Sequence, residues 1–424
     1  MLIDFKYGKF SRRGDIMQKN FFYLILSTLI ANIASSILYI GITWYVLTSV
    51  NGEILYGSIV LTATITGFAI SNFIGKIIDR YNKKKIFIRL HLIVSLLFLL
   101  IFLLLIRNIE FGIATLFVSY MILSVYSMFY WNIILSITQQ IFSIKEYKSI
   151  NSKMEIIGQI SSVFSIIAGF IIYSVNFLFI IIACSIAFAI SAMTFKKIKI
   201  IEAEKNNISN STFSGFTYLK NNKYLFFLLF ALYTPFIAII IGNFTQPAFV
   251  VNVLNGTPVI IGAMESIYAI SAVITSLLIP KMNEKNEFVL IVISMIVFSV
   301  GTIAMGLIKI VIIFLGLEAI QGYGNPAIRI IRKTIMMKTI PKKFIGRVYG
   351  SLETISYMAR IAFLAIFILI IKYTGSGILI AIQGIFVLAF VFVVIYSFRK
   401  MQIKAQPDKN PKRFYLSGYY QKHR

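Results

Sequence analysis

The chain has 424 residues, a formal net charge of +26 and a mean hydropathy of +0.86. Charged residues make up only 13% of it, whereas a water-soluble domain carries about 25%. This composition excludes an ordinary soluble globular protein and predicts that lipid surrounds most of the surface. The charges gather in short clusters between apolar runs of roughly 20 residues, the length that crosses a bilayer as an α-helix.

Long apolar runs, rather than short alternating segments, indicate helices, because unpaired backbone groups are very costly in hydrocarbon. We therefore predict an all-α integral membrane fold with twelve transmembrane helices. The first run is too long for the apolar part of a signal peptide, and no clear cleavage site follows it. In chain order, the predicted spans are 21–48, 55–74, 86–106, 112–136, 154–173, 177–195, 224–248, 259–280, 288–308, 310–328, 348–371 and 377–398.

The distribution of basic residues predicts the orientation. With the N-terminus inside, the 41 Lys and Arg residues all fall on the cytoplasmic side except Arg107, Lys309, Lys372 and Arg360. This bias follows the positive-inside rule, so we expect a multi-pass protein of the plasma membrane with both termini in the cytoplasm. The rule also explains the positive charge without a nucleic-acid partner. We expect the basic tail to contact anionic lipid headgroups.

The longest polar interval, 196–223, separates six predicted spans from six. The flanking stretches 21–195 and 224–398 are equal in length, and internal repeats of this kind are common in transporters. We therefore predict two six-helix bundles joined by a cytoplasmic central loop. A cytoplasmic N-terminal tail over 1–20 and a basic cytoplasmic C-terminal tail over 399–424 complete the chain.

A charged motif follows the second predicted span. From Gly75 to Lys85 it reads G-K-I-I-D-R-Y-N-K-K-K. Gly75 allows close helix approach, Asp79 can accept hydrogen bonds from a facing helix N-terminus, and the basic cluster holds the loop inside. The alternative is a basic loop with a chance Asp-Arg pair.

This motif resembles the signature loop of the major facilitator superfamily, G-x-x-x-D-R-x-G-R-K, and its position after the second of twelve spans argues against chance. Asn82 stands where the pattern has glycine, a mild change because asparagine tolerates a left-handed turn. The resemblance implies the major facilitator fold, alternating access and an inner gate. The residues expected in that gate are Gly75, Asp79, Arg80, Lys83, Lys84, Lys85 and Glu353.

Two further segments resemble exporters grouped with macrolide-efflux proteins. Residues 213–220 read F-S-G-F-T-Y-L-K and residues 340–348 read I-P-K-K-F-I-G-R-V, similar to the segments G-F-x-Y-L and P-x-x-x-x-G-R-V of that group. The loop with Lys145, Glu146, Tyr147 and Asn151 is similar too. However, 112–136 has no arginine and 154–173 no proline, unlike the proton-coupled drug antiporters, which puts their standard coupling arrangement in question.

Glu318 is the main candidate for coupling or substrate binding, because an ionisable side chain inside a span is costly unless compensated. It lies about 12 Å into its span, near the midplane. Gln321 and Asn325 follow on the same face. Two interpretations stay open: Glu318 takes up a proton or pairs with a cationic substrate, or Arg360 on a neighbouring span neutralises it.

Three further charged side chains lie within predicted spans. Glu265 is shallower, and either binds a cation or a proton, or makes a polar helix contact. Glu353 lies near the cytoplasmic end of its span, where we expect it to pair with Arg80 or its basic neighbours. Arg360 must pair or face water, and a role in anion binding stays open.

The first half carries polar stripes instead of charges. The resemblance implies that spans one, four, seven and ten line the cavity, whereas hydrogen bonding between helices explains such stripes equally well. The stripe residues expected to face substrate are Asn32, Tyr39, Tyr120, Trp131, Asn243 and Gln246. Such a mixed wall suits a bulky amphipathic or cationic molecule better than a sugar.

These observations predict a secondary active transporter, not an enzyme, that exports macrolide-like drugs as a monomer and possesses neither metal nor cofactor. His91 and His423 have no ligand-spaced partner, the lone Cys184 forms no intrachain disulfide, and no phosphate-binding loop is present. Proton coupling is one option for the energy source. The alternatives are a lipid or siderophore transporter of the same fold, and a transport-inactive sensor or immunity protein.

Overall fold

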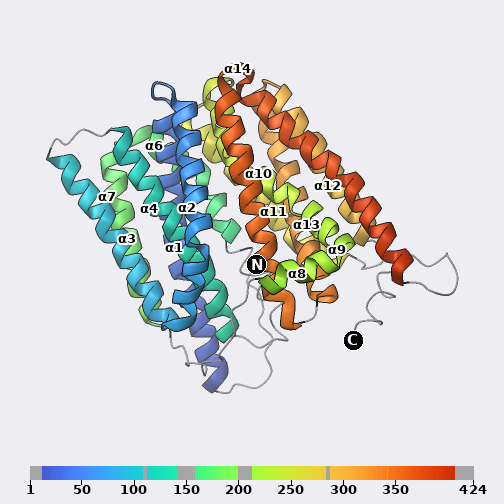
Figure 1. The fold of residues 1–424 in the computed structure, drawn as a ribbon. Coiled ribbons are helices and arrows are strands. Elements are labelled where there is room, and N and C mark those ends of the chain that lie inside the picture. The colour runs from blue at the N-terminus through green and yellow to red at the C-terminus, as the bar shows by residue number, and fades with distance from the viewer. Residues whose placement is uncertain are drawn as a thin grey trace. The chain divides into compact units, whose positions relative to one another are not determined.

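The computed structural model describes residues 12–107, 112–141, 156, 158–198, 213–282, 287–340 and 342–405. All regular elements within these ranges are helical (Figure 1). The first half of the chain contributes α1 (Arg12–Leu47), α2 (Gly52–Arg80), α3 (Lys83–Ile106), α4 (Ile113–Ile141), α6 (Ser165–Ser174) and α7 (Phe177–Lys196). The second half contributes α8 (Phe213–Asn221), α9 (Lys223–Ala231), α10 (Thr234–Asn252), α11 (Pro258–Leu278), a 3-10 turn η2 (Ile279–Lys281), α12 (Glu287–Leu307), α13 (Val311–Thr339) and α14 (Lys342–Ala405).

Ten helical stretches of the described residues are long and apolar enough to cross a membrane. One of them, Val348–Met401, has 54 residues, about 80 Å of straight helix, and therefore exceeds a single crossing. Gly375 interrupts α14 with φ 75° and ψ 158°. Figure 1 shows α14 as two helical rods that meet at a bend. A shorter apolar helix, Gly158–Ser174, supplies one more segment. The predicted all-α fold of twelve membrane-spanning segments is confirmed.

Asparagines mark the helix junctions. Asn51 has φ 56° between α1 and α2, a left-handed conformation that asparagine adopts more readily than most residues. Asn82 behaves differently from the sequence expectation, because its φ is −61°. Its side chain caps α3 by accepting a hydrogen bond from the Lys85 amide at 3.0 Å. Asparagine thus replaces the glycine of the motif as a helix cap, and a left-handed turn is not required.

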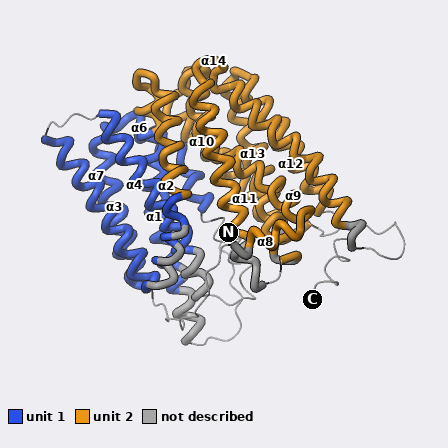
Figure 2. The backbone as a smooth tube through the Cα atoms, in the orientation of Figure 1, with its two compact units in different colours: residues 1–42, 69–206 blue, residues 43–68, 207–424 orange. Residues whose placement is uncertain are grey.

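Contacts divide the chain into two compact units (Figure 2). Unit 1 comprises Met1–Ile42 and Ala69–Asn206, and unit 2 comprises Thr43–Phe68 and Asn207–Arg424. The predicted halves would place 43–68 in the first bundle, whereas these residues make their contacts within unit 2. Tyr56, for example, donates a hydrogen bond to the Asn243 carbonyl at 3.1 Å. The division into two six-helix bundles stays a prediction.

Hydroxyl side chains join the helices of unit 1. Ser95 of α3 and Ser185 of α7 each donate to the other's backbone carbonyl, at 2.8 and 2.7 Å. Ser27 of α1 and Ser191 of α7 do the same, at 2.9 and 2.8 Å. Small residues of this kind let helix backbones approach closely while satisfying their own polar atoms in an apolar environment.

In unit 2, glycine permits the closest approach of α12 to α14. A Cβ atom added to Gly306 would lie 2.2 Å from the Gly377 carbonyl oxygen, and one added to Gly377 would lie 2.5 Å from the Gly306 carbonyl oxygen. Both contacts are with backbone, which cannot rotate away. This helix pair therefore depends on the absence of a side chain at both positions.

We predict that Gly306→Ala destabilises the protein by about 1–3 kcal/mol, because overpacking displaces a whole helix. The measurement is thermal unfolding of purified protein in a mild detergent. Gly316→Ala is the matched control: a Cβ there meets nothing within 4 Å, so its unfolding temperature should stay equal or rise slightly. Equal unfolding temperatures for the two variants would contradict the packing argument.

Candidate functional site

The stripe residues of unit 1 bring α1 and α4 together. The rings of Tyr39 and Tyr120 meet edge to face with centroids 5.3 Å apart. Asn32 makes a side-chain hydrogen bond to Tyr130. Trp131 is 51% exposed and lies over Gly158, where a Cβ would be 3.0 Å from its ring. Part of the stripe therefore ties helices together, and the open ring of Trp131 is its most accessible member.

The gate motif is described in part. The side chains of Gly75, Asp79 and Arg80 lie outside the described residues, so their expected gate role stays a prediction. Lys84 donates to the Ile198 carbonyl beyond the end of α7, while Lys85 is exposed. The basic cluster therefore begins α3 and holds the end of α7 against it.

His91 lies in the aromatic core of unit 1. Its Nδ1 is 2.9 Å from the Phe87 carbonyl oxygen, and its Nε2 is 3.1 Å from the Tyr126 hydroxyl. Cys184 of α7 is buried as a free thiol, with its Sγ 3.6 Å from the Ala34 carbonyl oxygen of α1. Within the described residues, no group of three or more His, Cys, Asp or Glu side chains could hold a metal ion.

Buried amides form a hydrogen-bonded network inside unit 2. Gln246 of α10 donates to the Gln321 side-chain oxygen of α13 at 2.9 Å. Gln321 in turn donates to the Thr302 hydroxyl of α12 at 3.2 Å. On α14, Gln383 donates to the Thr245 hydroxyl at 2.8 Å. Two predicted substrate-facing residues, Gln246 and Gln321, thus bind each other and are buried.

Glu318 lies one helical turn before this network and has a different environment. Its side chain is 2% exposed, and its Oε1 has no hydrogen-bond partner within the described part of the chain. Glu265 of α11 lies close enough to interact with it electrostatically. Around them, Ser271 donates to the Ala319 carbonyl at 2.6 Å, and Asn325 donates to the Tyr268 hydroxyl at 2.8 Å. Two carboxyl groups, one buried and one half-buried, therefore lie close together where α11 meets α13.

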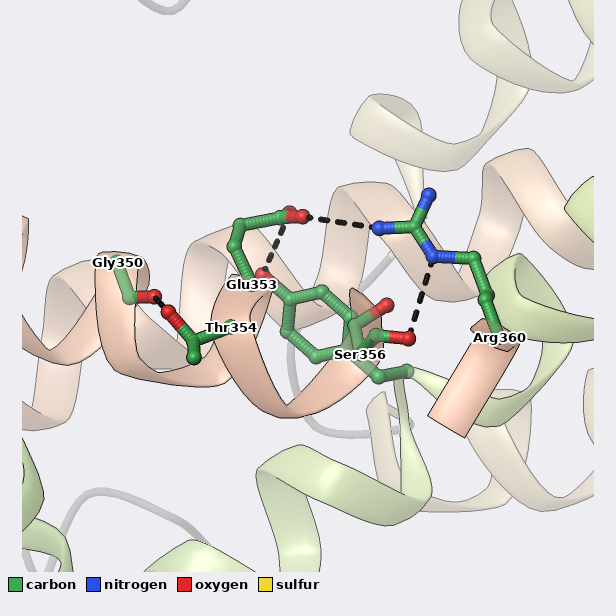
Figure 3. Close-up of polar contacts among 6 residues, drawn as sticks. Gly350, Glu353, Thr354, Ser356 and Arg360 are labelled. Carbon is green, nitrogen blue, oxygen red and sulfur yellow. Dashed lines mark hydrogen bonds and ion pairs between the residues drawn. The ribbon is translucent and has the colours of Figure 1, made fainter. Parts of the chain in front are cut away.

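Arg360 pairs with Glu353 rather than with Glu318. Arg360 Nη2 lies 3.8 Å from Glu353 Oε2, and its Nε donates to the Ser356 carbonyl at 3.2 Å (Figure 3). Glu353 also accepts a hydrogen bond from the Tyr233 hydroxyl at 3.2 Å. The interpretation in which Arg360 neutralises Glu318 therefore finds no support. The expected pairing of Glu353 with Arg80 stays a prediction, because the Arg80 side chain is not described.

Arg332 is a member of this cluster that the sequence analysis missed. The predicted span ended at 328, so Arg332 was assigned to a basic loop. The structure continues α13 to Thr339 and buries Arg332 against the Tyr233 ring, at 3.5 Å from the centroid. Such a residue is hard to recognise from the sequence, because the positive-inside rule predicts basic side chains near every cytoplasmic helix end. The i, i+3 and i+4 spacing of apolar residues through 328–336 is the sequence pattern that indicates this longer helix.

We predict that Gln246→Met and Gln321→Met each destabilise the protein by about 1 kcal/mol, because each leaves a buried amide without its partner. The double variant should cost less than the sum of the two, since no orphaned amide remains. Thermal unfolding of the four proteins forms a double-mutant cycle. Strict additivity would show that the hydrogen bond contributes nothing.

Comparisons with known proteins agree with this architecture. The family model described as Major Facilitator Superfamily matches residues 24–363. A mutant of the nucleoside transporter NupG is similar with a TM-score of 0.65 and 13% identity, covering 90% of this chain and 100% of that chain. A bacterial homologue of the iron transporter ferroportin, in an outward-facing state, has a TM-score of 0.62 and 14% identity over 90% of this chain and 99% of that chain.

A search of curated proteins found no match. At these sequence identities, the similarity to the solved structures supports the fold but not a specific function. The family match covers most of the chain and agrees with the motif at Gly75–Lys85 and with the helical architecture. The chain belongs to the Major Facilitator Superfamily and is a multi-pass membrane transporter, not an enzyme.

Proposed function

We propose that this transporter exports bulky amphipathic or cationic small molecules of the macrolide type, coupled to proton movement through Glu318. The observation that carries the proposal is the buried carboxyl group of Glu318, whose Oε1 has no hydrogen-bond partner in the described ranges. An ionised carboxylate in such a place needs a counter-charge. A proton or the cationic group of a substrate would supply it, and each would exclude the other.

Glu265 supports exchange between proton and substrate at this junction. Two carboxylates in electrostatic contact repel each other when both are ionised, so a shared site takes up a proton or a cation more readily than an isolated one. The amide network beside Glu318 keeps α10, α12 and α13 in a fixed register. Binding of a proton or of a cationic substrate would therefore affect several helices of unit 2 together.

A lipid cargo is the second candidate. A groove of about 180 Å³ on unit 1 is lined by apolar side chains of α1 and of the helix around Gly158–Ser174. Its volume is below the roughly 300–1,000 Å³ of typical small-molecule sites, and Ser36 in its wall already bonds Ser165 at 2.8 Å. This groove could seat part of an acyl chain but not a whole lipid, so it does not by itself support a lipid cargo.

Glu318→Gln should abolish proton-driven export of radiolabelled erythromycin into inside-out vesicles, because the amide keeps the shape and loses the exchangeable charge. We expect at least a roughly tenfold lower uptake rate in the variant, with no dependence on the imposed pH gradient. Glu265→Gln should shift the pH at which uptake is half-maximal. Uptake by Glu318→Gln that still follows the pH gradient would remove Glu318 as the coupling acid.

The gate role of the signature motif has a separate test. Asp79→Asn should reduce uptake strongly while expression and elution from size-exclusion chromatography match the unmodified protein, since only a closed-state contact is lost. Lys281→Gln, at an exposed lysine outside the motif, is the control and should retain most activity. Normal uptake by Asp79→Asn would argue that the motif is a topological signal only.

A further inference from the structure

The cluster around Glu353 contains more positive charge than negative charge. Arg332 and Arg360 are both buried in unit 2, at 3% and 6% exposure. Among the described residues, the carboxylate that both arginines interact with is Glu353. A guanidinium group does not give up its proton in proteins, so the excess charge cannot be removed by titration. It requires an anion or water.

Arg360 forms only a weak, single-point ion pair with Glu353. The ion pair is long, at 3.8 Å, and involves one nitrogen and one oxygen rather than a two-pronged contact. The other carboxylate oxygen accepts from the Tyr233 hydroxyl. The Glu353 side chain keeps 23% of its surface exposed. The pair therefore lies at the edge of the buried cluster, within reach of a molecule that enters from outside.

Arg332 is the less satisfied of the two arginines. Its Nη1 donates to the Leu232 carbonyl at 3.3 Å, while its buried Nε has no hydrogen-bond partner among the residues that the structure describes. The guanidinium plane lies over the Tyr233 ring, whose hydroxyl in turn holds Glu353. A fully desolvated donor on a charged group is costly to leave unpaired. The site is thus arranged for one more acceptor.

Aromatic rings surround the two guanidinium groups. Arg360 lies 4.0 Å from the Tyr357 ring centroid and 5.5 Å from that of Phe236. Phe236 also lies 5.8 Å from Arg332, so it stands between the two cations. Such rings stabilise the arginines through cation–π contact and offer flat apolar surfaces beside them. The combination suits a ligand with an acidic group attached to an apolar or aromatic body.

We propose that Arg332 and Arg360 form a binding site for the acidic group, carboxylate or phosphate, of an amphipathic ligand. Arginine favours both groups because its planar fork matches their oxygen atoms. The site extends the proposed substrates to amphipathic molecules with an acidic group, and it rests on the proposed transport function for its biological meaning. Binding at the site can nevertheless be measured without transport, so the two proposals fail separately.

The test is thermal unfolding of the full-length protein in a neutral detergent with benzoate, phenyl phosphate or the uncharged benzyl alcohol. Benzoate or phenyl phosphate should raise the unfolding temperature by mass action, and benzyl alcohol should not. The anion that acts more strongly identifies the group. No stabilisation of the unmodified protein by either anion beyond that of benzyl alcohol would overturn the proposal.

Substitutions that change the charge of the cluster test anion binding separately from folding. Arg332→Gln removes one of the two arginines that form the site, so it should fold normally and bind the anion at least roughly tenfold more weakly. Glu353→Gln removes the competing carboxylate and should bind at least roughly tenfold more tightly. If that single variant fails to fold, Arg360→Gln removes the other arginine of the site and should weaken anion binding as Arg332→Gln does.

Two controls complete the design. Arg399→Gln removes an exposed arginine and should leave anion binding unchanged. Glu318→Gln should also bind the anion normally, whatever its effect on transport. Full anion binding by Arg332→Gln would assign Arg332 a purely structural role and refute the site.

Discussion

The hydrocarbon of the bilayer offers no hydrogen-bond partners, and the structure follows from this constraint. Backbone groups are satisfied within helices, which explains why the described chain contains no other regular structure. Side-chain hydroxyls turn back to carbonyls four residues earlier or bond a neighbouring helix, as Ser95 and Ser185 do. Buried amides bond each other, as Gln246 and Gln321 do. Against this background, a polar atom without a partner stands out as an exception that needs a reason.

Several buried polar atoms of unit 2 lack a hydrogen-bond partner among the described residues, and two of them belong to side chains of opposite charge. These are a carboxyl oxygen of Glu318 and the Nε of Arg332. In each case the neighbouring charge increases the imbalance, since Glu265 lies near Glu318 and Arg360 shares Glu353 with Arg332. Neither arrangement stabilises the folded state by itself. A protein that exchanges ligands must leave some groups unsatisfied until the ligand arrives, and these two are the best candidates.

The sequence was sufficient for the features that depend on hydrophobicity. Helix number, the all-α class and the family follow from apolar length and from one motif, because the bilayer imposes the same requirement on every span. The partners of charged side chains were not predictable in this way. Arg360 was within reach of Glu318 by depth, and only the packing of α14 shows that Glu353, two turns away on the same helix, is its partner. Arg332 was missed because α13 extends beyond the apolar window that defined its span.

Residue type also does not determine the backbone conformation at helix junctions. Residue type indicated that Asn82 could replace a glycine with positive φ, yet the backbone there is extended and the side chain caps a helix. Asparagine serves both purposes, so its identity does not decide between them. At Gly375, by contrast, the break in α14 occurs where no regular helix could continue, and the predicted boundary between 371 and 377 includes it. Predictions were accurate where one physical requirement dominated.

The position of the two unsatisfied groups on one helix bears on mechanism. Glu318 and Arg332 both belong to α13 and are fourteen residues apart, about 21 Å along the axis. At that separation they cannot neutralise each other, so each needs its own counter-charge. Pro326 lies between them and removes one backbone hydrogen bond, the usual place for a helix to bend. A ligand that carries both a cationic and an acidic group could reach both sites only if it were about as long as this separation. For smaller ligands the two sites must act at different times or on different molecules.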